Sequence, residues 1–167
     1  MGTRHLILVY YKRQYHIAQY GQWDGYPGGQ GLTVLQFVSD PVNLSKLTAV
    51  LDAGDMLYKP THGQLKPSLS RDTGAKILKI VADATEPVPI IKALEFITDG
   101  IFCEWAYVVD LDEGAMEVYS GSRDKEGKSR FRKVKALKDA KHFPSLVGRW
   151  KFTDLPTKTE FLDWFSK

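Results

Sequence analysis

The 167-residue chain has very little cysteine and no long apolar run. Its single cysteine, Cys103, has no partner for an intrachain disulfide, and no Cys/His spacing of a structural zinc site surrounds it. We therefore expect a reducing, cytoplasmic compartment. No apolar stretch reaches the roughly 20 residues that span a bilayer, and the run from Leu6 to Tyr11 is too short for a signal peptide. These absences predict no membrane partner.

The remaining composition is that of an ordinary globular domain. Hydrophobic residues make up 43% of the chain and charged residues 26%, which excludes disordered and fibrous classes. A chain of this length buries a core without metal or disulfide staples. Because no repeat or linker divides the sequence, we expect residues 1–167 to form a single domain. The oligomeric state is left open by the sequence.

Apolar patterns predict two β-hairpins and several helices. Residues His5–Tyr11 and Gln14–Tyr20 flank a polar break and should form the first hairpin, with Leu6–Val9 buried on both faces because it is apolar throughout. Cys103–Leu111 and Ala115–Tyr119 should form the second. The other expected elements are a helix from Leu32 to Asp40, a second through Leu44 and Leu51 to near Gly54, a third from around Asp72, a short fourth over Ile90–Ile97, a strand at Gly148–Thr153 and a helix opened by a capping box at Thr157–Glu160.

The order of these elements predicts the fold class. Hairpins alternate with groups of helices, so most strands would pair with antiparallel neighbours. This order favours an α+β fold with a mainly antiparallel sheet covered by helices over a parallel doubly wound sheet.

The segment Gly21–Gly31 is the first candidate for a site. It holds five of the chain's 14 glycines, which let the backbone approach a partner closely. A helix that begins after the segment would turn its free amide groups toward it, a geometry that attracts anions. We expect a small molecule here, and the alternative is a turn that packs its aromatic rings into the core. The side chains that would bind the ligand are Gln22, Trp23, Asp24 and Tyr26.

Four charged residues are further candidates for ligand binding. Glu104 lies among apolar neighbours, where an isolated charge would be expensive, and Arg4 or Arg71 could pair with it. Arg71 and Asp72 open an expected helix. These residues either converge with Asp24 on one cleft or form separate structural ion pairs.

Two aspartates suggest a metal site at first sight. Asp110 and Asp112 bracket the second hairpin and would share one face of a strand. No calcium-loop spacing extends from them, so we interpret them as solvated turn residues. No metal and no cofactor is assigned.

The segment Arg123–Lys141 is strongly basic. It holds nine of the 23 basic residues against three acidic ones, a net charge of +6. Such a segment could bind an acidic partner or the phosphates of nucleic acid. Phe131 is its only aromatic residue and no nucleic-acid motif accompanies it, so we disfavour nucleic acid and interpret the segment as a solvated basic loop.

Two resemblances to known groups follow from the N-terminal part. The opening Met1-Gly2-Thr3-Arg4 and the run Gln22–Pro27 resemble short uncharacterised proteins of phage and fungal genomes, a resemblance that implies no activity. The first thirty residues are also similar to N-terminal-nucleophile hydrolases, which cleave a Gly-Thr bond so that the freed threonine amine acts as base toward its own hydroxyl. That resemblance implies Thr3 as the nucleophile, although Gln19 stands where the family has an Asp.

Together these patterns favour a small-ligand-binding or amide-hydrolase-like intracellular domain. Its site would lie at Gly21 to Gly31, with Thr3 and Asp24 in catalytic roles. The alternative is a non-enzymatic binding module that recognises an acidic partner or nucleic acid through Arg123 to Lys141.

Overall fold

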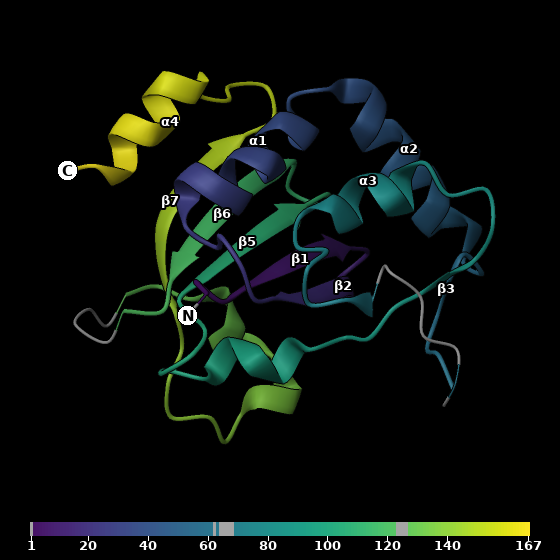
Figure 1. Ribbon diagram of the computed structural model, residues 1–167, viewed down its shortest axis with the longest axis horizontal. Coiled ribbons are helices and arrows are strands. Elements are labelled where there is room, and N and C mark those ends of the chain that lie inside the picture. Colours follow the sequence, from purple (N-terminus) through teal and green to yellow (C-terminus); the bar gives the residue numbers. More distant parts are fainter. Residues whose placement is uncertain (1, 62, 64–68, 123–126) are drawn as a thin grey trace.

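The computed structural model describes residues 2–61, 63, 69–122 and 127–167. The fold is α+β, as the order of elements predicted, and a five-stranded sheet is its largest element among these residues (Figure 1). The strand order is β2-β1-β5-β6-β7, and every neighbouring pair is antiparallel except β1 and β5. The strands are β1 His5–Tyr11, β2 Gln14–Gly21, β5 Trp105–Asp110, β6 Ala115–Ser120 and β7 Ser145–Lys151.

Strand β1 is buried on both faces, as its unbroken apolar run predicted. Leu6, Ile7, Leu8 and Val9 have no exposed surface. Because side chains alternate along a strand, Ile7 and Val9 enter one core and Leu6 and Leu8 the other. The parallel pairing with β5 follows from the long connection between β2 and β5, which returns the chain to the free edge of β1.

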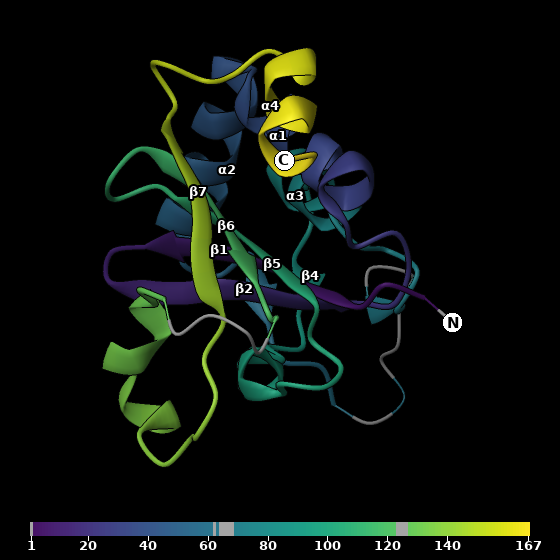
Figure 2. The same ribbon diagram turned by 90° about the vertical axis from the view of Figure 1, so that its left-hand side faces the viewer.

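The α-helices gather on one face of the sheet (Figures 1 and 2). The Asp40 carboxylate caps α2 by accepting the Val42 amide, and Thr157 and Glu160 form the expected capping box on α4. Their apolar sides pack on the sheet in one core. The helices are α1 Leu32–Val38, α2 Pro41–Ala53, α3 Lys76–Ala82 and α4 Lys158–Phe165, and the π-helical turn η1 Pro27–Gly31 runs directly into α1.

The opposite face of the sheet carries short 3-10 helices and residues 127–141 of the basic segment. Ile97, Phe131 and Leu137 are buried there against the strands. The elements are η3 Leu94–Thr98, η4 Arg130–Lys133 and η5 Lys135–Leu137. A separate two-stranded parallel ribbon consists of β3 Leu57–Tyr58 and β4 Val88–Pro89.

Two helix predictions were wrong at their starts. The third helix begins at Lys76 and not near Asp72, because Ser70 accepts the amides of Asp72 and Thr73 and holds a turn before it. The helix expected over Ile90–Ile97 is reduced to η3. Its first residues stay extended, since the Ile90 and Ala93 amides donate to carbonyls of neighbouring segments.

The structure can also be compared with two broader expectations, one about membrane spans and one about the N-terminal-nucleophile-like fold. In the described part of the chain, no helix combines the length and the apolar character needed to cross a bilayer. The N-terminal-nucleophile-like version of the fold is not confirmed. Its predicted N-terminal hairpin is present as β1 and β2, but β1 also pairs in parallel with β5 in a sheet of only five described strands.

Candidate functional site

The segment Gly21–Gly31 is tied to the residues before α3. The Trp23 indole Nε1 donates to the Asp72 carboxylate at 2.7 Å. The Gln22 amide donates to the Arg71 carbonyl at 3.0 Å, and the Arg71 guanidinium reaches the Gln22 side chain at 3.4 Å. The structure thus brings four of the sequence-predicted ligand residues together, as two pairs that join the loop to its neighbour.

Gln30 closes the same loop from its other end. Its side-chain oxygen accepts the Ala75 amide at 2.8 Å, and its side-chain nitrogen donates to the Trp23 carbonyl at 3.4 Å. The backbone amide of Gln30 donates to the Asp24 carbonyl, and those of Gly29 and Gly31 donate to the Tyr26 carbonyl. The loop uses these three backbone amides internally, so they are not free to bind an anion.

Arg4 and Glu104 form a second pair. The Glu104 carboxylate accepts the Arg4 backbone amide at 3.0 Å, and the Glu104 amide donates to the Arg4 carbonyl at 3.2 Å. The Arg4 guanidinium lies over the Phe102 ring, 5.0 Å from its centroid. Glu104 is thus held by the backbone of Arg4, and among the described residues it forms no side-chain ion pair with Arg4 or Arg71.

Thr3 and Asp24 both lie close enough to a buried histidine, His5, to affect its pKa. The Thr3 carbonyl accepts the Gly25 amide at 2.9 Å, and Asp24 takes the left-handed conformation with φ of 55°. His5 is fully buried, and among the described residues neither ring nitrogen makes a hydrogen bond of good geometry, so the interaction with the Thr3 backbone is a weak one. Burial lowers the pKa of His5 to about 4, although the Thr3 backbone and the Asp24 charge raise it in part. The catalytic roles of Thr3 and Asp24 stay predictions.

The sequence-predicted residues therefore fall into neighbouring pairs around the N-terminal strand. Residues 22–30 line none of the five main cavities in the described ranges. Glu104 lines a different one, a cavity of about 300 Å³. Trp23 and Tyr26 stay 41% and 47% exposed, so they are not packed into the core. The loop therefore offers a ligand exposed aromatic side chains and no part of these five cavities.

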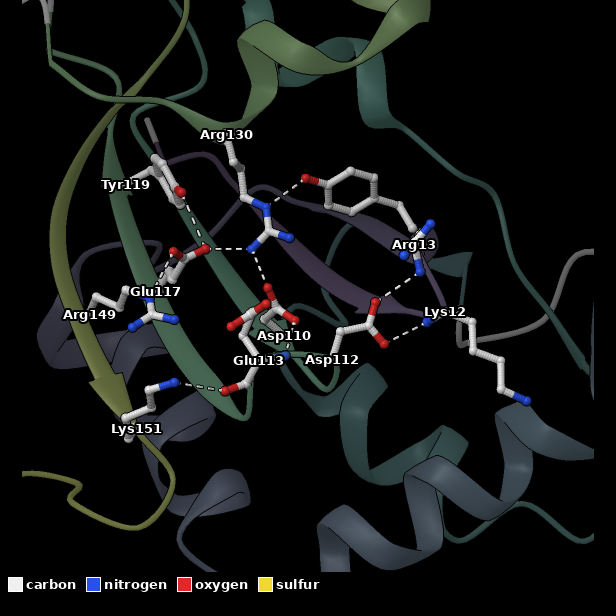
Figure 3. A network of polar contacts seen from close by, with 11 residues as sticks. Lys12, Arg13, Asp110, Asp112, Glu113, Glu117, Tyr119, Arg130, Arg149 and Lys151 are labelled. Atoms are coloured by element: carbon white, nitrogen blue, oxygen red, sulfur yellow. Dashed lines mark hydrogen bonds and ion pairs between the residues drawn. The ribbon is translucent and has the colours of Figure 1, made fainter.

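The face of the sheet that carries the 3-10 helices holds a charged network that the sequence did not reveal (Figure 3). The Arg130 Nη1 atom of η4 donates to the Asp110 carboxylate at 2.8 Å and to the Glu117 carboxylate at 2.5 Å. Arg130 Nε donates to the Tyr15 hydroxyl at 2.9 Å. Tyr119 donates to Glu117 at 3.2 Å. Strands β2, β5 and β6 thus present one cluster to a single arginine.

Strand geometry explains why the two carboxylates meet. Asp110 ends β5 and pairs with Ala115, and Glu117 lies two residues further along β6, so both point to the 3-10 side of the sheet. The interpretation of Asp110 as a solvated turn residue is wrong. It is only 4% exposed, because the segment that carries Arg130 folds over it.

The protonation behaviour of this cluster follows from its burial. Desolvation alone would lower the pKa of Arg130, but its interactions with Tyr15, Glu117 and Asp110 outweigh that effect and raise the pKa. Desolvation raises the pKa of Tyr15 to about 12 against the opposing effect of Arg130. At neutral pH, Arg130 is therefore a cation and Tyr15 a neutral hydroxyl.

A cleft of about 490 Å³ opens beside this cluster. Arg130 and Lys133 line it from η4, and Lys135 from η5. Within the described ranges, Arg13, Lys133 and Lys135 form no ion pair, whereas Arg149 contacts Glu117 at 3.4 Å. The lining holds five cationic residues (Arg13, Arg130, Lys133, Lys135 and Arg149) against three acidic ones (Asp110, Glu113 and Glu117).

Residues 127–141 of the basic segment are therefore more ordered than a solvated loop. Residues 123–126 lie outside the described part of the chain, but η4 and η5 are docked through the buried Phe131 and Leu137. Only the alternation of side chains within β6 could have indicated the site from sequence, since Glu117 points to one face of the sheet and its neighbours Met116 and Val118 point to the other. Alternation does not say that Arg130 covers that face.

Neither the remaining geometry nor known proteins assign a function. In the ranges that the structure describes, no three His, Cys, Asp or Glu side chains gather in a way that could hold a metal ion. Comparison with protein-family models, with curated proteins and with solved structures finds no match. The chemistry of the cleft is therefore the basis for a functional proposal.

Proposed function

We propose that this chain is a binding domain whose basic cleft receives an acidic segment of a partner protein. The observation that carries the proposal is a set of three cations, Arg13, Lys133 and Lys135, that form no ion pair with any described residue and lie along one cleft of about 490 Å³. Cations without acid partners gain most from an incoming carboxylate, because they lose no existing ion pair.

The buried network anchors the backbone of the segment that carries two of these cations. Asp110 and Glu117 hold Arg130 at the start of η4, and Phe131 is buried beside it. Lys133 and Lys135 follow within five residues on η4 and η5. A partner would thus meet a backbone that is already ordered, which reduces the entropy lost on binding.

A protein segment fits this cleft better than a nucleic acid. Proteins that bind single strands use exposed aromatic rings on which bases stack. The only aromatic residue of the basic segment, Phe131, is fully buried, and the Arg130 guanidinium covers the Tyr10 ring at 4.4 Å from its centroid. Glu113 in the lining would also repel a dense row of phosphates.

Fluorescence anisotropy with labelled peptides tests the proposal. The probe is a ten-residue peptide of alternating Glu and Ser, and the comparison peptide carries Gln in place of Glu. We expect binding of the acidic peptide alone, weakened by rising salt because exposed charges are screened. The double substitution Lys133→Glu/Lys135→Glu should lower the affinity at least about tenfold, since each reversed charge contributes on the order of 1 kcal/mol.

The matched control is Lys138→Glu/Lys141→Glu. These two lysines are exposed in the same basic segment but do not line the cleft, and the change in net charge is identical. Equal losses in both double variants would mean that only overall charge matters, and the cleft would lose its role. A single-stranded oligonucleotide of equal charge that binds more tightly than the acidic peptide would also overturn the choice of partner.

A further inference from the structure

A cavity separate from the basic cleft lies on the helix-covered side of the molecule. Its volume is about 720 Å³, within the range of about 300–1,000 Å³ that small-molecule sites have. Three parts of the chain enclose it: the C-terminal end of α2, the ribbon of β3 and β4 with the residues after each strand, and His16 of β2.

The walls of this cavity are well defined. Gly54 ends α2 with φ of 80°, a conformation that turns the chain sharply toward β3. The ribbon is held by backbone hydrogen bonds from Val88 to Met56 at 2.7 Å and from Ile90 to Tyr58 at 2.8 Å. His16 Nε2 donates to the Tyr11 carbonyl at 2.9 Å, since a carbonyl oxygen can only accept, and this fixes the orientation of the ring.

Most of the lining is apolar. Ile91 is 50% exposed although its neighbour Ile90 is 4% exposed, so aliphatic surface faces the open volume. Apolar surface gathered in a concave site favours the apolar body of a ligand over water. The apolar side chains that line the cavity are Val50, Leu51, Met56, Leu57, Pro60, Ile90 and Ile91.

Two lysines give the same cavity a cationic end. Lys59 directly follows β3, and Lys92 lies three residues after β4. Because β3 and β4 are parallel, both lysines leave the ribbon at the same end. Both are exposed, neither forms an ion pair within the described ranges, and no carboxylate lines the cavity.

We propose that this cavity binds a small amphipathic carboxylate. Its apolar body lies against the aliphatic wall at Leu57 and Ile91, and its carboxylate accepts hydrogen bonds from the ammonium groups of Lys59 and Lys92. A neutral apolar molecule would leave both cations without a partner, and a small hydrophilic anion would leave the aliphatic wall exposed to water.

Calorimetric titration with three probes tests this site on the intact chain. The probes are decanoate below its micelle-forming concentration, decanol with the same body, and acetate with the same head group. We expect decanoate to bind at least about tenfold more tightly than decanol, because two exposed ion pairs contribute that much, and acetate not to bind. Amide chemical-shift changes on adding decanoate should centre on residues 50–60 and 90–92.

Substitutions separate the two parts of recognition. Lys59→Ala/Lys92→Ala should reduce the affinity for decanoate to that for decanol, whereas Lys76→Ala/Lys158→Ala, which removes the same charge from exposed positions elsewhere, should leave the preference unchanged. Ile91→Asp, at an exposed position, should weaken both probes. Equal binding of decanoate and decanol to the wild-type chain, shift changes centred elsewhere, or an unchanged preference in the Lys59→Ala/Lys92→Ala variant would each overturn the proposal.

Discussion

The Arg130 guanidinium lies 2.8 Å from the Asp110 carboxylate, although 20 residues separate them in the chain. This contact fastens the basic segment to the sheet. The Asp110 side chain is 5% exposed and that of Arg130 19%, so the pair is largely removed from water. A largely buried pair gains little over a well-packed apolar pair, but breaking it by removing one partner leaves an uncompensated charge.

Replacing Arg130 by Met should therefore destabilise the protein strongly. Asp110 and Glu117 would lose their shared cation while they remain mostly buried. We expect the free energy of unfolding to fall by about 3 kcal/mol, measured by urea denaturation monitored by circular dichroism.

The control for this prediction removes the carboxylates as well. The triple variant Arg130→Met/Asp110→Asn/Glu117→Gln leaves no unpaired buried carboxylate in the cluster, and only the partly exposed Arg149 loses its ion pair with Glu117, so much of the lost stability should return. A triple variant less stable than Arg130→Met alone would show that the carboxylates stabilise the fold by some route other than their pairing with Arg130.

His5 should make the stability of the chain depend on pH between about 4 and 6.5. Burial lowers the pKa of His5 from 6.5 to about 4, so between these pH values His5 binds a proton in the unfolded chain but stays neutral in the folded chain. The contribution of His5 to the free energy of unfolding should thus be fully present above pH 6.5 and be lost as the pH drops toward 4, by roughly 3 kcal/mol at most. Urea denaturation across this range measures the slope.

Two variants test the assignment of that slope to His5. His5→Leu removes the titrating group, so the slope of the free energy of unfolding against pH should fall by the amount that corresponds to about one proton. Asp24→Asn removes a charge that raises the pKa of His5, so the ring should titrate at a lower pH in an NMR titration of the imidazole. A His5 signal that titrates near pH 6.5 in the folded wild-type chain would contradict the burial argument.

Local sequence patterns were sufficient where neighbouring residues decide the structure. The apolar run Leu6–Val9 indicated a strand buried on both faces, and Thr157 with Glu160 indicated the start of α4. Both signals are properties of a few consecutive residues. The third helix shows the limit, because the Gln30 side chain accepts the Ala75 amide near its start from 45 residues away.

The candidate site was missed for the same physical reason. Whether Glu117 faces solvent or a buried network depends on what covers that side of the sheet. The covering residue, Arg130, belongs to a segment whose charge predicted a solvated loop. Composition gives the charge of such a segment, but the segment is ordered because Phe131 is buried in the core on the 3-10 side of the sheet.

Gln30 joins the glycine-rich loop to α3, so its removal should loosen both. Gln30→Ala loses the acceptor for the Ala75 amide and the donor to the Trp23 carbonyl. We expect a loss of about 1 kcal/mol in the free energy of unfolding and a change in tryptophan fluorescence. Gln36→Ala, at an exposed position of α1 with no side-chain hydrogen bond in the described part of the chain, is the matched control and should change neither quantity.

Cys103 should report the integrity of the core beneath the sheet. It is 4% exposed, and burial raises the pKa of its thiol to about 12, so almost no thiolate is present at pH 8. A disulfide reagent such as Ellman's reagent should therefore react fully in guanidinium chloride and only slowly with the native protein, at a rate set by opening of the structure. Because Phe131 packs in the same core as Cys103, Phe131→Ala should accelerate the native reaction, whereas Lys138→Ala on the surface should not. Rapid labelling of the native wild-type chain would mean that this core opens far more readily than its packing implies.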